Sequence, residues 1–210
     1  MENKPNYLVF DTETISLERP FIYNIGYVIY SGDGTPLLCR NLVISQIWDD
    51  KKLFASAYYA NKRPLYVSYM RGRTAQKVKW GYACRLMKGD MKKYGVQVAY
   101  AYNAPFDQKA FNYTHNYFKN ITRPLDMVEV VDILPLARRV LGDNKDYLAF
   151  CQLTKATYKN SKGEIAPRFK VENVYPFLMG LNEYTEEHTA LQDSRDEGAI
   201  LHALGSWVSK

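Results

Sequence analysis

Residues 7–14 read YLVFDTET, a short apolar run that ends in two carboxylates set two positions apart. A continuous apolar run of this length is typical of a central strand that is covered on both faces of a sheet. Side chains alternate along a strand, so Asp11 and Glu13 should point to the same face. Two adjacent carboxylates at a buried strand end indicate a site for a hard divalent cation, which would offset their repulsion. The alternative is an exposed strand end without a ligand.

The pattern around this run predicts an α/β fold with a mixed sheet and helices on its faces. Four further strand-like runs follow the first: 22–30, 37–44, 96–102 and 127–133. Turn residues at 31–34 join the first two of these into an antiparallel hairpin. Helical patterns cover most of the remainder: about 49–94, the segment after residue 103, 134–141, 147–158 and about 190–207.

Composition favours a single globular domain over residues 1–210. The chain is 47% hydrophobic and 24% charged, and no internal repeat or linker interrupts it. No apolar run approaches the roughly 18 residues that a membrane span needs, and the first residues lack the apolar core of a signal peptide. Three cysteines far apart in the sequence argue against a disulfide framework and against a zinc site. We therefore expect a cytoplasmic protein with no membrane partner.

Positive charge is concentrated in one segment of the chain. The net charge is +6, but residues 62–93 carry ten Lys or Arg and one acid, Asp90, so the remaining residues are slightly acidic. Such a segment is either a solvated helical face or an electrostatic footprint for nucleic acid. We predict the second, with four basic residues in contact with the substrate strand: Arg71, Arg73, Lys77 and Lys79. Aromatic residues interspersed among these charges could stack on unpaired bases: Tyr66, Tyr69, Trp80 and Tyr82.

Two later motifs carry further acidic residues. Residues 103–107 read NAPFD and follow a predicted strand, so Asn103 should cap a helix and Asp107 should lie in its first turn. His188 and Asp193 come shortly before and within the last predicted helix. Five helical positions would turn these two side chains apart, so they converge only if His188 lies in the loop before the helix. For each motif alone, the alternative is a surface residue near a helix start.

Taken together, these three motifs resemble those of the DEDDh subgroup of 3′→5′ exonucleases, which includes the proofreading ε subunit of bacterial DNA polymerase. The motifs are an acidic pair after an apolar strand, Asn-x-x-x-Asp after another strand, and His-x-x-x-x-Asp at the last helix. Residues 22–26 and 131–138 also resemble the family, and residues 55–60 resemble free-standing phage-encoded members. The resemblance extends over nearly the whole chain, and it implies an RNase H-like mixed sheet of five strands.

The resemblance also implies a catalytic set: Asp11, Glu13, Asp107, His188 and Asp193. The four carboxylates would hold two divalent cations, Mg²⁺ or Mn²⁺, because oxygen ligands suit these ions. Asp11 would bridge both cations, Glu13 and Asp193 would bind the first, and Asp107 would act on the second. His188 would be the general base. Three decoys are set aside: Asp126; Asp132, which should cap the following helix; and Asp196, which should fall on a different helical face from Asp193.

The family further implies contacts between the site and the terminal nucleotide, which we assign to Thr14, Ile15 and Asn103. This chain has Ile15 and Ser16 where family members often have Thr-Gly, so Ile15 and Leu17 either wedge under the last base or belong to the core. The expected activity is hydrolysis of nucleic acid from a free 3′ end to 5′-mononucleotides. We expect DNA as substrate, with RNA as the alternative, because no motif encodes contact with a 2′-hydroxyl.

Two other functions fit the same motifs. A proofreading accessory would need a polymerase partner, and a nucleic-acid-binding module could keep the fold without catalysis. The chain ends three residues after Trp207, which leaves no tail of the kind that engages a polymerase, so a free-standing enzyme is favoured. The presence of all five site residues argues against a silent module. Any polymerase or other protein partner stays unknown.

Overall fold

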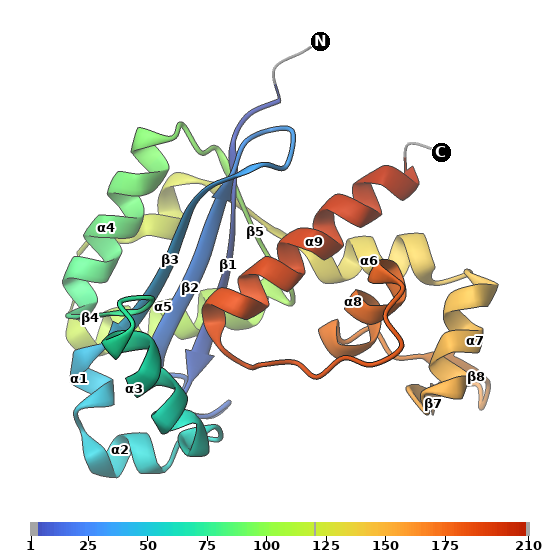
Figure 1. Cartoon of the computed structure of the whole chain (residues 1–210), viewed down its shortest axis with the longest axis horizontal. Helices are drawn as coiled ribbons and strands as arrows, with labels where there is room; N and C mark the ends of the chain where they lie inside the picture. The colour runs from blue at the N-terminus through green and yellow to red at the C-terminus, as the bar shows by residue number, and fades with distance from the viewer. Residues whose placement is uncertain (1–3, 120, 209–210) are drawn as a thin grey trace.

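A computed structural model describes residues 4–119 and 121–208 of the chain. The central sheet has the order β4-β3-β2-β1-β5-β6 (Figure 1). Its strands are β1 (Tyr7–Thr14), β2 (Ile22–Tyr30), β3 (Pro36–Ile44), β4 (Gln76–Val78), β5 (Val98–Ala101) and β6 (Glu129–Asp132). Strand β2 pairs antiparallel with β1 and β3, whereas β5 runs parallel to both β1 and β6 and β4 runs parallel to β3. The mixed α/β fold is therefore confirmed.

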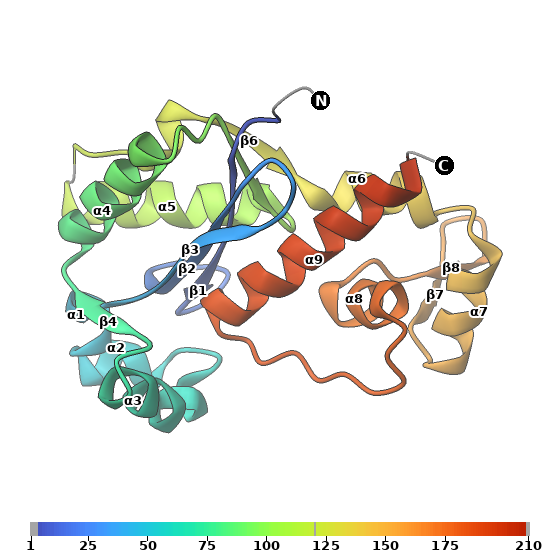
Figure 2. The same ribbon diagram turned by 45° about the horizontal axis from the view of Figure 1, so that its top comes forward.

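The helices of the described residues cover both faces of this sheet. The first group is α1 (Ser45–Trp48), α2 (Lys51–Ala55), η1 (Ala60–Lys62), α3 (Arg63–Arg71), α4 (Trp80–Lys93), α5 (Ala104–Phe118) and η2 (Pro124–Met127). The second group is α6 (Ile133–Leu141), α7 (Lys145–Leu153), α8 (Val171–Met179) and α9 (Ala190–Val208). Figure 2 shows α1–α3 on one side of the start of α9 and α8 on the other.

Strand β1 lies between two apolar clusters because its side chains alternate. Leu8 and Phe10 belong to a cluster with residues of α4 and α5, whereas Val9 packs with residues of α6 to α9. All three side chains are fully buried, as the continuous apolar run predicted. Asp11 and Glu13 continue the alternation of Val9, which directs them toward the α9 side at the end of the strand.

Two expectations from the sequence, the number of strands in the sheet and the length of one helix, are wrong. The sheet has six strands rather than five, because Gln76–Val78 adds to the edge of β3 within the segment that was expected to be helical. The expected helix at 147–158 is also too long. Helix α7 ends at Leu153, and β7 (Thr157–Lys159) then pairs with β8 (Ile165–Pro167) in a separate two-stranded sheet. The short edge strands lack the periodic signal of a long element, so propensity alone did not reveal them.

Helix α9 lies unusually close to the sheet, and this contact positions the last motif. A Cβ at Gly26 would come within 2.0 Å of the Ala190 carbonyl carbon, so only glycine allows the approach. The Ser194 hydroxyl donates to the Gly26 carbonyl oxygen over 2.9 Å. Residue 26 pairs with Asp11 in the β1–β2 register, so the first turn of α9 is held beside the acidic end of β1. Within 4–119 and 121–208, no helix is both long and apolar enough to cross a membrane.

Candidate active site

The acidic pair of β1 lies at the strand end as the sequence predicted. Glu13 is 7% exposed, and Tyr23 donates to its Oε2 over 3.4 Å. Asp11 is half-buried. Asn24, which pairs with Glu13 in the register, accepts a hydrogen bond from the Ala190 amide over 3.1 Å. The neighbouring strand β2 therefore anchors the start of α9 beside these carboxylates.

Helix α5 brings Asp107 to the same strand. Asp107 is 3% exposed, and the Thr12 hydroxyl donates to its Oδ1 over 2.6 Å. Asn103 was expected to cap α5 with its side chain, and this prediction is wrong. The Asn103 side chain makes no capping hydrogen bond, and its backbone is in the left-handed region, with φ of 64°. The backbone N–H of Asn103 instead donates to Asp132 Oδ1 over 2.8 Å. Asp132 also caps α6 through the Leu134 amide, as predicted.

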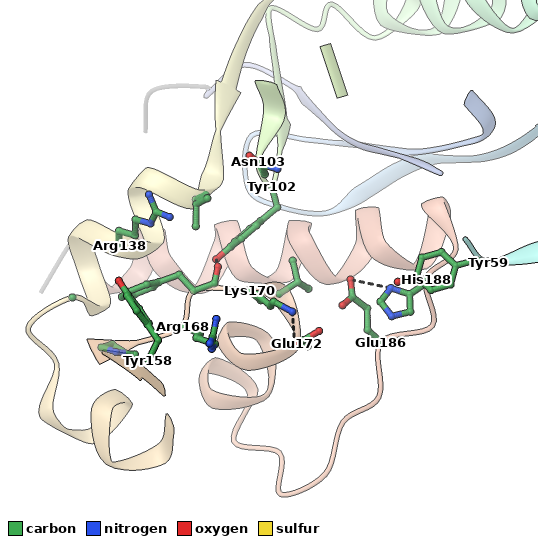
Figure 3. Close-up of a pocket in the computed structure, with 15 residues that line it drawn as sticks. Tyr59, Tyr102, Asn103, Arg138, Tyr158, Arg168, Lys170, Glu172, Glu186 and His188 are labelled. Carbon is green, nitrogen blue, oxygen red and sulfur yellow. Dashed lines mark hydrogen bonds and ion pairs between the residues drawn. The ribbon is translucent and has the colours of Figure 1, made fainter. Parts of the chain in front are cut away.

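His188 lies in the loop before α9, as the spacing required. Its backbone has φ of 51°, in the left-handed region. The imidazole stacks on Tyr59 with 4.5 Å between ring centroids, and its Nδ1 lies 3.7 Å from Glu186 Oε1 (Figure 3). Lys62 and the Tyr69 hydroxyl hold this loop from the other side through the Glu187 carbonyl and carboxylate oxygens. Contacts from α3 and the preceding turn therefore fix the position of His188.

These elements bring three of the predicted acids together. One oxygen from each of Asp11, Glu13 and Asp193 lies within 4.8 Å of the other two. Asp193 also belongs to a second such group, with Glu186 and His188. Asp107 lies outside both groups, but its charge acts on Asp11. We call the four acids Asp11, Glu13, Asp107 and Asp193 the carboxylate site.

Burial is the largest cause that raises the pKa of each acid in the carboxylate site, and the charges of nearby acids raise it further. The pKa of Asp107 rises to about 7 and that of Glu13 to about 8. For Asp193, burial and the charge of Glu13 raise the pKa to about 10. The pKa of Asp11 is raised by burial, then by Asp107 and Glu197. Carboxylates placed so close together and out of water favour either protons or a cation.

The donor set fits a divalent cation. All three converging atoms are carboxylate oxygens, the ligands that Mg²⁺ and Mn²⁺ prefer. Two buried oxygens, Asp193 Oδ1 and Glu197 Oε2, have no hydrogen-bond partner among the described residues. A buried carboxylate oxygen without a partner is costly, so these atoms indicate a ligand that the protein chain itself does not supply. The residues at this end of β1 could therefore hold metal.

The three residues predicted to contact the terminal nucleotide, Thr14, Ile15 and Asn103, differ in how far they are exposed. Thr14 is half-buried at the end of β1, and Asn103 is exposed beside the start of α5. Ile15 is 1% exposed and belongs to the core, so its assignment as a nucleotide contact is wrong. Its carbonyl accepts from the Tyr58 amide over 3.1 Å, which holds it inward. Leu17 is 74% exposed, so its side chain is accessible to a base.

The basic segment is divided between structural contacts and exposed charge. Arg71, Arg73, Lys77 and Lys79 are exposed, and Lys77 pairs with Asp49 over 2.9 Å. Their contact with substrate stays a prediction. Tyr66 and Trp80 are fully buried, so these two cannot stack on bases; Tyr82 is exposed. Aromatic residues between charges on a helix reach the core when they fall on its inner face.

A cleft beside His188 holds basic residues that the sequence did not single out. It has a volume of about 910 Å³ and runs from His188, Tyr59 and Glu186 to the start of α6 and the β7–β8 hairpin (Figure 3). Its basic lining residues are Arg138, Arg168 and Lys170, and Tyr158 lies beside them. Arg138 lies in α6, whereas Arg168 and Lys170 lie between β8 and α8, so Arg138 is far from the other two in the sequence and no single charge cluster marked the three.

No protein-family model matches the chain, and no curated protein does either. Solved structures do match, and the mixed sheet with helices on both faces is the RNase H-like fold of exonucleases. The particular similarity is to exonuclease I. The enzyme from Methylocaldum szegediense is 14% identical over 96% of this chain, with a TM-score of 0.62. E. coli exonuclease I in complex with a 5cy-dT13 oligonucleotide is 12% identical over 97%, with a TM-score of 0.63.

A zinc-bound complex of E. coli exonuclease I with single-stranded DNA is similar to the same degree, with 13% identity over 97% of this chain and a TM-score of 0.62. This chain spans only 40%, 40% and 41% of the three exonuclease I chains. At these identities the likeness establishes the fold, which agrees with the fold that the three sequence motifs predicted. What exonuclease I binds and does therefore bears on this chain as a proposal.

Proposed function

We propose that this protein is a metal-dependent 3′→5′ exonuclease that hydrolyses DNA to 5′-mononucleotides. The observation that carries the proposal is the convergence of Asp11, Glu13 and Asp193 within 4.8 Å, with Asp107 behind them and His188 on the adjoining loop. The fold shared with exonuclease I supports the same assignment.

The carboxylate site would hold two divalent cations, Mg²⁺ or Mn²⁺. Asp11, Glu13 and Asp193 would hold one cation, and Asp11 with Asp107 would hold the other. Such paired ions, when bound, stabilise the negative charge on the attacking and leaving oxygens of a phosphodiester. The contribution of the chain is to hold these acids rigidly, through the Thr12 hydroxyl on Asp107 and the close packing of α9 on Gly26.

His188 would accept the proton of the attacking water. In the hydrolysis, the water oxygen attacks phosphorus, the bond from phosphorus to the 3′ oxygen breaks, and that oxygen takes up a proton to leave a new 3′ end. Burial and the positive charge of Lys62 lower the pKa of His188, so the imidazole is neutral near neutral pH and can accept a proton. Stacking on Tyr59 limits its rotation.

The cleft beside His188 would hold the strand that leads to the scissile bond. Its basic residues Arg138, Arg168 and Lys170 are exposed and can contact successive phosphates. Tyr158 is 45% exposed and can stack on a base. A cleft that presents a few separate basic side chains, rather than a broad basic surface, favours single-stranded over duplex nucleic acid. E. coli exonuclease I structures with single-stranded DNA support this choice by analogy.

Digestion of end-labelled oligonucleotides tests the proposal. Single-stranded DNA labelled at the 5′ end should shorten progressively in Mg²⁺ or Mn²⁺, whereas EDTA should abolish the reaction. Parallel reactions with duplex DNA and RNA rank the substrates, and the Asp11→Asn protein is the negative control. Robust cleavage in EDTA would sink the metal assignment, and internal cleavage or loss of nucleotides from the 5′ end would overturn the direction. Tight binding without cleavage would support the silent binding module instead.

A further inference from the structure

Glu197 is an acid of the site that neither the motifs nor the spacing predicted. It lies one turn beyond Asp193 in α9, and residues four apart on a helix share a face. The side chain is 3% exposed. The charges of Asp107 and Asp193 act on it, and its own charge acts on Asp11. Glu197 therefore adds a carboxylate to the α5 side of the carboxylate site.

Only part of the hydrogen-bonding capacity of the Glu197 carboxylate is satisfied by the described residues. The Tyr102 amide donates to the carboxylate, but Oε2 is buried and has no partner among the described residues. Its neighbour Asp196 is equally buried, at 2% exposed, yet both its oxygens are satisfied. Tyr184 donates to Asp196 Oδ2 over 2.6 Å, and Gln192 donates to Oδ1 over 2.9 Å. The two acids therefore differ in partners rather than in burial.

An unpartnered carboxylate oxygen in such a place points to a ligand. Burying a charge among like charges costs free energy unless an opposite charge accompanies it. Asp193 Oδ1 is the other orphan oxygen and lies one turn away on the same helix face. A hard dication binds six or more oxygens, more than the four predicted acids supply without water. These two oxygens are thus available donors beside Asp11 and Asp107.

We propose that Glu197 is a fifth carboxylate ligand of the site and holds a divalent cation on the side of Asp107. The inference rests on the proposed function, because it requires that the carboxylate site binds cations at all. It goes further in adding a donor from the second turn of α9, beyond the four acids of the motifs. Glu197→Gln keeps the size of the side chain and removes its charge, so it separates ligation from packing.

Calorimetric titration with Mn²⁺ alone tests this assignment without any substrate. Glu197→Gln should lower the Mn²⁺ affinity at least about tenfold, and it should raise the melting temperature of the metal-free protein because one repulsive charge is removed. Asp196→Asn is the matched control, and it should bind Mn²⁺ as the parent does. Glu197→Leu provides a second variant, which should also lose affinity while it packs against the neighbouring apolar residues.

The outcomes separate this inference from the proposed function. If Glu197→Gln and Glu197→Leu bind Mn²⁺ as tightly as the parent while Asp11→Asn does not, Glu197 is a structural acid and the cation site stands. If the parent itself binds no Mn²⁺, both the inference and the proposed function are overturned. Equal losses in Glu197→Gln and Asp196→Asn would also overturn the inference, since they would indicate a general disturbance of α9.

Discussion

The buried acid Asp90 and the carboxylate site differ in the hydrogen-bond and ion-pair partners that the protein gives them. Asp90 of α4 is 7% exposed, and its carboxylate accepts from the Tyr27 hydroxyl over 2.8 Å and from Arg40 Nε over 2.9 Å. Glu13, Asp107 and Asp193 of the carboxylate site are buried to a similar degree, but acids lie close to them, and Asp193 leaves an oxygen without a partner. Burial therefore does not distinguish the two groups.

The difference in partners indicates a difference in role. A buried acid with a donor and a cation from its own chain is complete, and it stabilises the contact between α4 and the sheet. A buried cluster of acids without such partners destabilises the apo protein, and a bound cation would offset that cost, as we propose for the carboxylate site. The comparison predicts that changes at the two groups affect different quantities, namely activity at one and stability at the other.

The largest expected effect follows removal of one charge from each group. Asp11→Asn should lose several orders of magnitude in the rate of 3′-end hydrolysis, because the acid central to both cation positions is lost. Asp90→Asn should retain the rate but lower the free energy of unfolding by roughly 1–3 kcal/mol, since Arg40 and Tyr27 lose their charged acceptor. Oligonucleotide digestion and urea denaturation measure the two quantities. Loss of activity in Asp90→Asn, at a temperature where it is folded, would remove the distinction.

A smaller loss is expected when the base is removed and the acids are kept. His188→Ala should lose roughly 10²–10⁴-fold in kcat and should still bind Mn²⁺ and single-stranded DNA. The rate of the parent should rise with pH through the range in which His188 loses its proton, and this limb should disappear in the variant. Steady-state kinetics across a pH series measures both effects. A variant with parental kcat would exclude His188 as the base, whatever the role of the acids.

Substrate contacts should give a third and smaller effect, and they also allow a comparison of two regions. Replacing Arg138, Arg168 and Lys170 by Ala should raise KM and lower the slope of log affinity against log salt by about 2 for a single strand, at about 0.7 for each lost phosphate contact. Saturated rates should change less. Binding of a labelled oligonucleotide over a salt series measures the slope.

The matched comparison replaces Arg71, Arg73, Lys77 and Lys79, which were predicted from the sequence to hold the strand. Lys77 is paired with Asp49 and the others are exposed, so a strand that runs along α3 would give a comparable change in slope. If this quadruple variant binds like the parent while the cleft variant is weakened, the basic segment is a solvated surface. If the reverse holds, the cleft is not the path of the strand.

The smallest effect concerns the stability of the metal-free protein against pH. The folded pKa values of Asp107, Glu13 and Asp193 are raised to about 7, 8 and 10, above those of the unfolded chain. Their contribution to stability is fully present below the unfolded values of about 4 and is lost as pH rises through the folded values. The melting temperature in EDTA should therefore fall between pH 5 and about pH 10, and Mn²⁺ should restore it. A melting temperature that rises across this range would contradict the raised pKa values.

Much of the fold was accessible from the sequence because it depends on local pattern. The bounds of β2 were predicted to the residue, and α9 begins at Ala190 as expected. Asp132 caps α6 because an acid before a helical run satisfies a free amide of its first turn. The alternation of Asp11 and Glu13 follows from the same local geometry. Neighbouring residues alone determine these features.

Only the tertiary structure decided which side chains meet. Ile15, Tyr66 and Trp80 are in the core, and no local signal distinguishes them from residues that could contact a base. Arg168 reaches the cleft because a short hairpin folds toward α6, and Glu197 reaches the site because α9 packs against Gly26. Each of these contacts joins segments far apart in the chain. Periodicity determines the face of an element on which a residue lies. The packing of that face on a distant element determines the partners of the residue. For a buried acid, these partners determine whether it stabilises the fold or is available to bind a cation.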